Sequence, residues 1–234
     1  MRLSEKYIPA TLDEIVGQPA VVSRLKQFVE SPSPCCLLFV GEPGIGKTAA
    51  ANALANDLGV CPWTGRHQIG AARLGVERIE KLFDDTLRMR PMEGVWHVLI
   101  VEELERCVSD GARSELKTRL SEGEMLPRLI LVATSNDVSK LEPALLERFS
   151  QFAFGSGPAF HEACLPTLAA IWEQECAQRG LDLPLPASWQ RWGVQSTPTG
   201  ERFSMRRAIN ALGDALDVRE IVARRERVGV AVGV

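Results

Sequence analysis

The residues from Gly41 to Thr48 have the types and spacing of a phosphate-binding loop. The segment reads GEPGIGKT and matches G-x-x-x-x-G-K-[ST], in which the glycines let backbone N–H groups turn inward around phosphates. We expect Lys47 to reach the β and γ phosphates of a nucleotide, and Thr48 to offer its hydroxyl to Mg²⁺. The predicted nucleotide contacts are Glu42, Pro43, Gly44, Ile45, Gly46, Lys47, Thr48 and Ala49.

Two adjacent carboxylates, Glu102 and Glu103, follow the apolar run VWHVLIV at 95–101. Glu102 is predicted to hold Mg²⁺ and Glu103 to polarise the attacking water. The usual order in such sites is Asp then Glu, so the longer Glu102 side chain must fold back to reach the metal. Weaker Mg²⁺ binding, slower turnover, or binding without much hydrolysis stay open, as does a solvated loop start.

Buried strands are needed to position these groups, and the chain contains matching apolar runs. The runs at 36–40, 95–101 and 129–133 each stop at glycine or polar residues, and helical stretches at 48–58, 74–90 and 110–122 alternate with them. This alternation predicts an α/β fold with a parallel sheet, which binds ligands at the carboxyl ends of its strands.

The composition changes after Phe154. The segment GSGP at 155–158 is typical of a linker, and 161–179 and 204–227 are predicted helices, followed by a frayed tail at 228–234. We therefore predict an α/β nucleotide-binding domain at 1–154 and a small helical domain at 155–234.

The bulk composition limits the class of protein. A net charge of −3 argues against a uniformly basic protein that coats nucleic acid, although a local basic patch stays possible. No apolar run approaches the roughly 20 residues that span a bilayer, and no signal-peptide core follows the N-terminus. We expect a soluble, cytoplasmic protein without a membrane partner.

The order of several further motifs resembles the small subunits of sliding-clamp loaders and related AAA+ ATPases of replication and recombination. These motifs are EKYIP at 5–9, TLDEIVGQ at 11–18, TSN at 134–136, LLERF at 145–149 and SMRRAIN at 204–210. The resemblance covers nearly the whole chain. It implies a P-loop AAA+ parallel sheet flanked by helices, a small helical lid domain, and ATP with Mg²⁺ as cofactors.

The resemblance also assigns roles to residues outside the phosphate loop. It implies that Asn136 orients the attacking water, with Ser135 as a competitor, and that Arg148 is an arginine finger presented to a neighbouring subunit. Arg206, or else Arg207, is implied as the lid arginine that senses the γ-phosphate. The implied adenine contacts are Tyr7, Ile8, Pro9, Ile15 and Val16.

The implied partners are further subunits in a homo- or hetero-oligomeric ring or spiral, DNA, and a sliding clamp or replication protein. Arg113, Lys117 and Arg119 are candidate DNA contacts, but a solvated helix of mixed charge explains them nearly as well. Two alternatives to a DNA-stimulated ATPase stay open. One is a low-turnover scaffold whose assembly ATP sets, and the other is a protein-remodelling ATPase, disfavoured because no aromatic pore-loop motif is evident.

Overall fold

The computed structural model describes residues 2–107, 109–121, 126–197 and 200–231. The chain divides into two compact units. Pro9–Gly155 form the first, which we call the sheet unit, and Ser156–Val234 together with Met1–Ile8 form the second, the helical unit.

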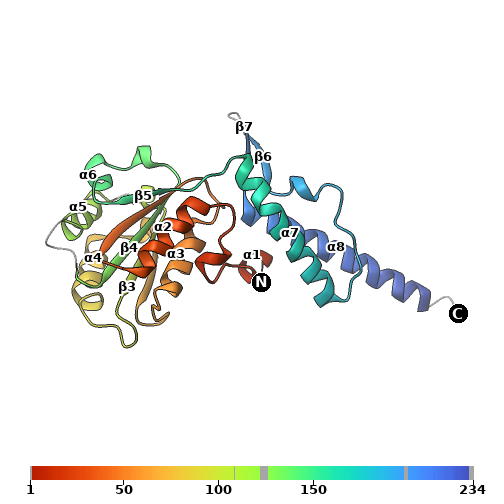
Figure 1. The fold of residues 1–234 in the computed structure, drawn as a ribbon, viewed down its shortest axis with the longest axis horizontal. Coiled ribbons are helices and arrows are strands. Elements are labelled where there is room, and N and C mark those ends of the chain that lie inside the picture. Colours follow the sequence, from red (N-terminus) through yellow and green to blue (C-terminus); the bar gives the residue numbers. More distant parts are fainter. Residues whose placement is uncertain (1, 108, 122–125, 198–199, 232–234) are drawn as a thin grey trace. The chain divides into compact units, whose positions relative to one another are not determined.

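The sheet unit is built on a five-stranded parallel sheet with the order β2-β3-β4-β1-β5 (Figure 1). At its centre β1 pairs with β4, from Cys35 beside Ile130 to Val40 beside Ser135. The strands are β1 (Cys35–Val40), β2 (Arg66–Gly70), β3 (His97–Glu102), β4 (Leu129–Ser135) and β5 (Ser150–Ala153).

Helices and short turns connect these strands. The α-helices are α2 (Pro19–Glu30), α3 (Lys47–Asp57), α4 (Val76–Lys81), α5 (Asp110–Arg119) and α6 (Pro143–Leu146). The 3₁₀ turns are η1 (Leu12–Glu14), η2 (Ala71–Arg73), η4 (Leu104–Arg106) and η5 (Val138–Lys140), and η3 (Leu82–Thr86) is a π turn. The predicted helix at 74–90 is thus a shorter α-helix that passes into a π turn.

The three strands that the sequence predicts are confirmed as β1, β3 and β4, because they are the apolar interior of the sheet. Every residue of β4 is buried, and so is every residue of β3 up to Val101. β2 (RHQIG) and β5 (SQFA) lie at the two edges, where one or both faces meet solvent. Their mixed polar sequences gave no strand signal.

The helical unit contains two long helices, α7 (Pro158–Arg179) and α8 (Met205–Ala231). Between them lie a 3₁₀ turn, η6 (Trp189–Arg191), and an antiparallel hairpin of β6 (Val194–Thr197) and β7 (Gly200–Phe203), which the sequence did not predict. The hairpin is tied to α7 because Phe203, which is 4% exposed, stacks on His161 at a ring distance of 4.4 Å. The predicted tail from 228 begins inside α8, and 232–234 lie outside the described residues.

The first residues of the chain belong to the helical unit, not to the domain 1–154 that the sequence predicted. Their short helix α1 (Leu3–Lys6) packs Leu3 beside Gly213 of α8. Lys6 and the Tyr7 hydroxyl both bond to the carboxylate of Glu175, at 2.5 and 2.8 Å. Glu175 is 3% exposed, so this buried carboxylate draws the segment onto α7.

None of the helices, within the described ranges, is both long and apolar enough to cross a membrane.

Candidate functional site

The phosphate loop joins the end of β1 to the start of α3. Gly41, Gly44 and Gly46 have φ values of 152°, 82° and 103°, which favour glycine. A Cβ on Gly41 would lie 2.7 Å from the carbonyl oxygen of Phe154, so no larger residue fits there without a shift. The Gly41 N–H also donates to the Ser135 carbonyl at 3.1 Å, which fixes the loop to the end of β4.

Lys47 is the buried cation of this loop, with 7% of its surface exposed. Its Nζ donates to the carbonyl oxygens of Gly41 and Glu42, at 2.6 and 2.7 Å, and to Oδ1 of Asn136 at 2.9 Å. The structure therefore brings two predicted site residues, Lys47 and Asn136, into direct contact. Lys47 begins the helix after β1, Asn136 directly follows β4, and these two strands are neighbours in the sheet. A buried ammonium that donates to two loop carbonyls and an amide oxygen is a suitable place for a phosphate group.

Glu105, which was not predicted from the sequence, bonds to a residue of the candidate site. Its Oε1 accepts from Nδ2 of Asn136 at 2.9 Å and from the Asn136 backbone N–H at 3.1 Å. It lies on η4, directly after β3, in the charged stretch LER that resembles an ordinary solvated turn. A carboxylate three positions after Glu102, close to the carboxyl end of β3, was the only signal available.

The acidic pair lies at the carboxyl end of β3, and β4 separates β3 from β1, the strand that leads into the phosphate loop. Glu102 is the last residue of the strand and is partly buried. Glu103 has a φ of 54°, rare outside glycine, and its N–H donates to Thr134 Oγ1 at 3.1 Å. Its carboxylate pairs with Arg106 at 3.1 Å, so the predicted base already has a cationic partner.

The groups proposed to hold Mg²⁺ are the Thr48 hydroxyl and the Glu102 carboxylate. Both are oxygen donors, the ligand type that this cation prefers, and Mg²⁺ is commonly held by one or two protein oxygens together with phosphate oxygens and water. Among the described residues, no group of three or more His, Cys, Asp or Glu side chains forms a metal site by itself. The donor set fits a metal that arrives with a nucleotide.

Ser135 was the competitor of Asn136 for the water-orienting role. It is fully buried, and its hydroxyl accepts from the Asp137 N–H at 3.2 Å. Asn136 is the one that bonds to Lys47, and its water-orienting role stays a prediction.

Arg148 is predicted to contact the nucleotide of a neighbouring subunit, and in this structure its side chain bonds to acceptors in the sheet unit. Its Nε donates to the Lys117 carbonyl at 3.1 Å, and a terminal nitrogen donates to Ser121 Oγ at 3.3 Å. A further bond goes to the Ala144 carbonyl. The side chain is partly exposed and meets neutral acceptors, which leaves its charge available to an anion.

The predicted adenine contacts are divided between the units. Pro9, Ile15 and Val16 belong to the sheet unit and are partly buried, whereas Tyr7 and Ile8 belong to the helical unit. Burial and the bond to Glu175 raise the pKa of Tyr7 to about 12.

The predicted lid arginine lies at the start of α8. Arg206 and its alternative, Arg207, are both exposed there. Both belong to the helical unit, and their role stays a prediction.

The three cations of α5 proposed for DNA contact are all paired with carboxylates. Lys117 bonds to Glu142 at 2.6 Å, Arg113 pairs with Asp110 at 3.2 Å, and Arg119 pairs with Asp84 at 2.7 Å. Any phosphate contact by this helix must therefore compete with ion pairs inside the chain.

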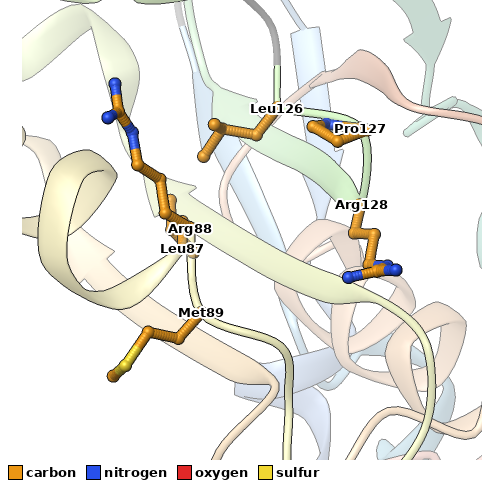
Figure 2. A pocket seen from close by; sticks show the side chains of 6 residues that line it. All are labelled: Leu87, Arg88, Met89, Leu126, Pro127 and Arg128. Atoms are coloured by element: carbon orange, nitrogen blue, oxygen red, sulfur yellow. The ribbon is translucent and has the colours of Figure 1, made fainter.

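A separate pocket lies at the opposite end of the central strands (Figure 2). Arg128, which precedes β4, lines it together with side chains that follow η3, whereas the phosphate loop meets the other end of β4. It is not the phosphate site. Its lining residues are Leu87, Arg88, Met89, Leu126, Pro127 and Arg128.

Comparisons with known proteins agree with this geometry. Replication factor C small subunits from Methanococcus maripaludis strain C7 and from Archaeoglobus fulgidus are 31% and 32% identical over 221 residues, which is 93% of this chain. The chain spans 65% of the length of these relatives.

Solved structures and a family model complete the comparison. The RuvB Holliday junction branch migration motor of Thermotoga maritima has a TM-score of 0.69 and 20% identity, and the match covers 92% of this chain and 67% of that one. This likeness shows the fold. The model of the ATPase family associated with various cellular activities (AAA) matches residues 37–156, more than half of the 234-residue chain. The chain therefore belongs to the AAA family of ATPases.

Proposed function

We propose that this chain binds and hydrolyses ATP with Mg²⁺, as one subunit of an oligomeric, cytoplasmic DNA-replication or repair assembly of the clamp-loader type. One observation carries the proposal. The buried Lys47 ammonium bonds at 2.9 Å to Asn136, at the point where β1 and β4 end side by side. This places a cation and a polar amide together where parallel sheets bind ligands.

The side chains at the carboxyl ends of these strands have distinct roles in the proposal. Lys47 and the loop N–H groups bind the phosphates, while Thr48 and Glu102 hold Mg²⁺, which neutralises phosphate charge when bound. Glu103 orients and polarises the attacking water, and Asn136 helps to position it. Arg148, and Arg206 from the lid, supply guanidinium groups for the charge that develops on the transferred phosphoryl group.

The assembly part of the proposal is supported by the relatives, whose name is replication factor C small subunit. We propose that neighbouring subunits complete each other's sites through Arg148, and that DNA and a sliding clamp are the partners. An arginine supplied by a neighbour typically contributes about 10³–10⁵-fold in rate, so a single subunit is an incomplete catalyst.

The test is the steady-state ATPase rate of the purified chain with Mg²⁺, alone and with primed or duplex DNA. We expect DNA to raise the rate several-fold and Arg148→Ala to abolish the stimulated rate without weakening nucleotide binding. Lys47→Ala is the matched control, because it should abolish binding as well. A wild-type rate equal to that of Lys47→Ala under all conditions would exclude the ATPase.

A second candidate is a low-turnover scaffold in which ATP binding sets assembly. It is favoured by the ion pair at 3.1 Å between Glu103 and Arg106, which engages the predicted base, and by Glu102 in place of Asp. Sedimentation with and without ATP separates the candidates, since a scaffold assembles on ATP while turnover stays near zero. Arg106→Ala should then raise turnover by releasing Glu103.

A further inference from the structure

The orientation of the Asn136 amide can be assigned from the chemistry of its two neighbours. A lysine ammonium only donates hydrogen bonds, and a carboxylate only accepts them. The atom 2.9 Å from Lys47 Nζ must therefore be the amide oxygen, and the atom 2.9 Å from Glu105 Oε1 must be the amide nitrogen. The chain Lys47, Asn136, Glu105 has one consistent direction of donation.

Glu105 holds this orientation with two bonds to the same residue. Its Oε1 accepts from the Asn136 side chain and also from the Asn136 backbone N–H at 3.1 Å. The turn that carries Glu105 is closed by a bond of 2.7 Å from the Arg106 N–H to the Glu103 carbonyl, and Leu104 anchors it at 1% exposure. The carboxylate is therefore placed by the backbone.

The second oxygen of Glu105 gives an independent indication of a specific role. Oε2 is buried and has no hydrogen-bond partner among the described residues. A buried acceptor without a partner lowers stability, and such groups in native proteins often serve a functional constraint.

We propose that Glu105 is a positioning residue that fixes Asn136 with its amide oxygen toward Lys47, so that Asn136 acts at the phosphate site as an acceptor only. Asn136 accepts from Lys47 and from the attacking water, and it does not donate to a phosphate oxygen. The proposal rests on the ATPase function proposed above.

The opposite orientation is disfavoured by both neighbours at once. If the Asn136 amide were rotated, its oxygen would face Glu105 Oε1 and its NH₂ group would face the Lys47 ammonium, each at about the 2.9 Å that now separates bonded atoms. Two hydrogen bonds would be replaced by two repulsive contacts. Removal of Glu105 takes away one of these constraints and frees the amide to turn.

The kinetic test compares Glu105→Ala with Glu105→Gln. Glutamine keeps an oxygen that accepts both Asn136 bonds, so its kcat should stay within about 3-fold of wild type, whereas alanine should lower kcat about 10–100-fold. KM should change little in both, because Lys47 still binds the phosphates. Thermal unfolding of each variant checks that it is folded.

A double variant shows whether Glu105 acts through Asn136. Glu105→Ala combined with Asn136→Ala should be no slower than Asn136→Ala alone, since there is no amide left to orient. Multiplicative losses would overturn the proposal. So would a Glu105→Gln variant as slow as Glu105→Ala, because that result assigns the effect to charge rather than to position.

A measurement that does not depend on ATP hydrolysis tests the positioning role of Glu105 separately from the proposed ATPase function. In ¹⁵N-labelled protein, the side-chain amide signal of Asn136 is identified by its loss in Asn136→Ala. It should shift strongly in Glu105→Ala and stay close to its wild-type position in Glu105→Gln. An unchanged signal in Glu105→Ala overturns the positioning role even if ATP is hydrolysed, whereas absent turnover with the expected shift refutes the ATPase alone.

Discussion

Glu175 is predicted to be the anchor of the N-terminal segment, and we expect its removal to destabilise the helical unit. Its carboxylate, with a side chain 4% exposed, bonds to Lys6 at 2.5 Å, to the Tyr7 hydroxyl at 2.8 Å and to Arg179 at 3.3 Å. Glu175→Ala leaves all three donors without this acceptor.

The magnitude follows from the burial of the partners. Breaking a fully buried ion pair costs about 3–5 kcal/mol, but the Lys6 side chain is 34% exposed and regains water, so we expect about 2–4 kcal/mol. Asp217→Ala is the matched control, since Asp217 pairs with the same Arg179 at 2.6 Å but is 65% exposed. That variant should lose at most about 0.5 kcal/mol.

The assay is urea unfolding followed by tryptophan fluorescence, because Trp172 is 1% exposed in the helical unit and reports its loss. With an m value of about 2 kcal/mol/M, Glu175→Ala should shift the midpoint by about 1–2 M. Equal midpoints for Glu175→Ala and Asp217→Ala would refute the reasoning, because they would show that burial of the carboxylate contributes nothing.

The stability difference between wild type and Glu175→Ala should also depend on pH. Burial acts to raise the pKa of the Glu175 carboxyl, but the bonds from Lys6 and Tyr7 outweigh it, and the pKa lies below its ordinary value. The stabilisation is therefore present above the unfolded pKa of about 4.3 and is lost as the pH falls through the folded pKa. The difference between wild type and Glu175→Ala should be constant from pH 7 to 5 and shrink below pH 4.

The remaining predictions concern the sheet unit. Gly41→Ala should cost about 1–3 kcal/mol in a denaturant titration, because its Cβ would meet the Phe154 carbonyl at 2.7 Å, and wild-type stability would contradict the reading of the loop. Glu103→Gly should abolish ATP hydrolysis yet unfold no earlier than wild type, because glycine relieves the φ of 54°. Burial, followed by the charge of His97, lowers the pKa of His67. Its stabilisation is present above about pH 6.5 and lost as the pH falls through the folded pKa, so His67→Gln should show a flatter melting-temperature profile between pH 7 and 5.

The interior strands of the sheet could be predicted because a strand buried on both faces is apolar at nearly every position. The runs at 36–40, 95–101 and 129–133 are apolar at nearly every position, and they form β1, β3 and β4. The edge strands have no such apolar run, since β2 has one buried residue among Arg66–Gly70 and β5 has one among Ser150–Ala153. An edge strand can form through backbone hydrogen bonds to its neighbour, so its side chains need not show an apolar pattern.

The candidate site could be proposed from the sequence where spacing along the chain encodes geometry. The loop that carries Lys47 follows from local sequence, and Asn136 follows from the resemblance to clamp-loader subunits. Glu105 could not be found this way, because its partner is 31 positions away and its neighbours make it look like part of a solvated turn. The anchoring of Tyr7 by Glu175 spans 168 positions and was equally hidden.

The separation between Lys6 and Glu175 also has a consequence for the order of folding. During synthesis the sheet unit, Pro9–Gly155, is complete before any of α7 has been made. The N-terminal segment must wait, unpaired, for a partner 169 residues later. Local strand and helix contacts close first, and contacts this far apart in the sequence close late. A ribosome-bound chain that stops before Glu175 should therefore contain a folded sheet with its first residues still accessible to protease.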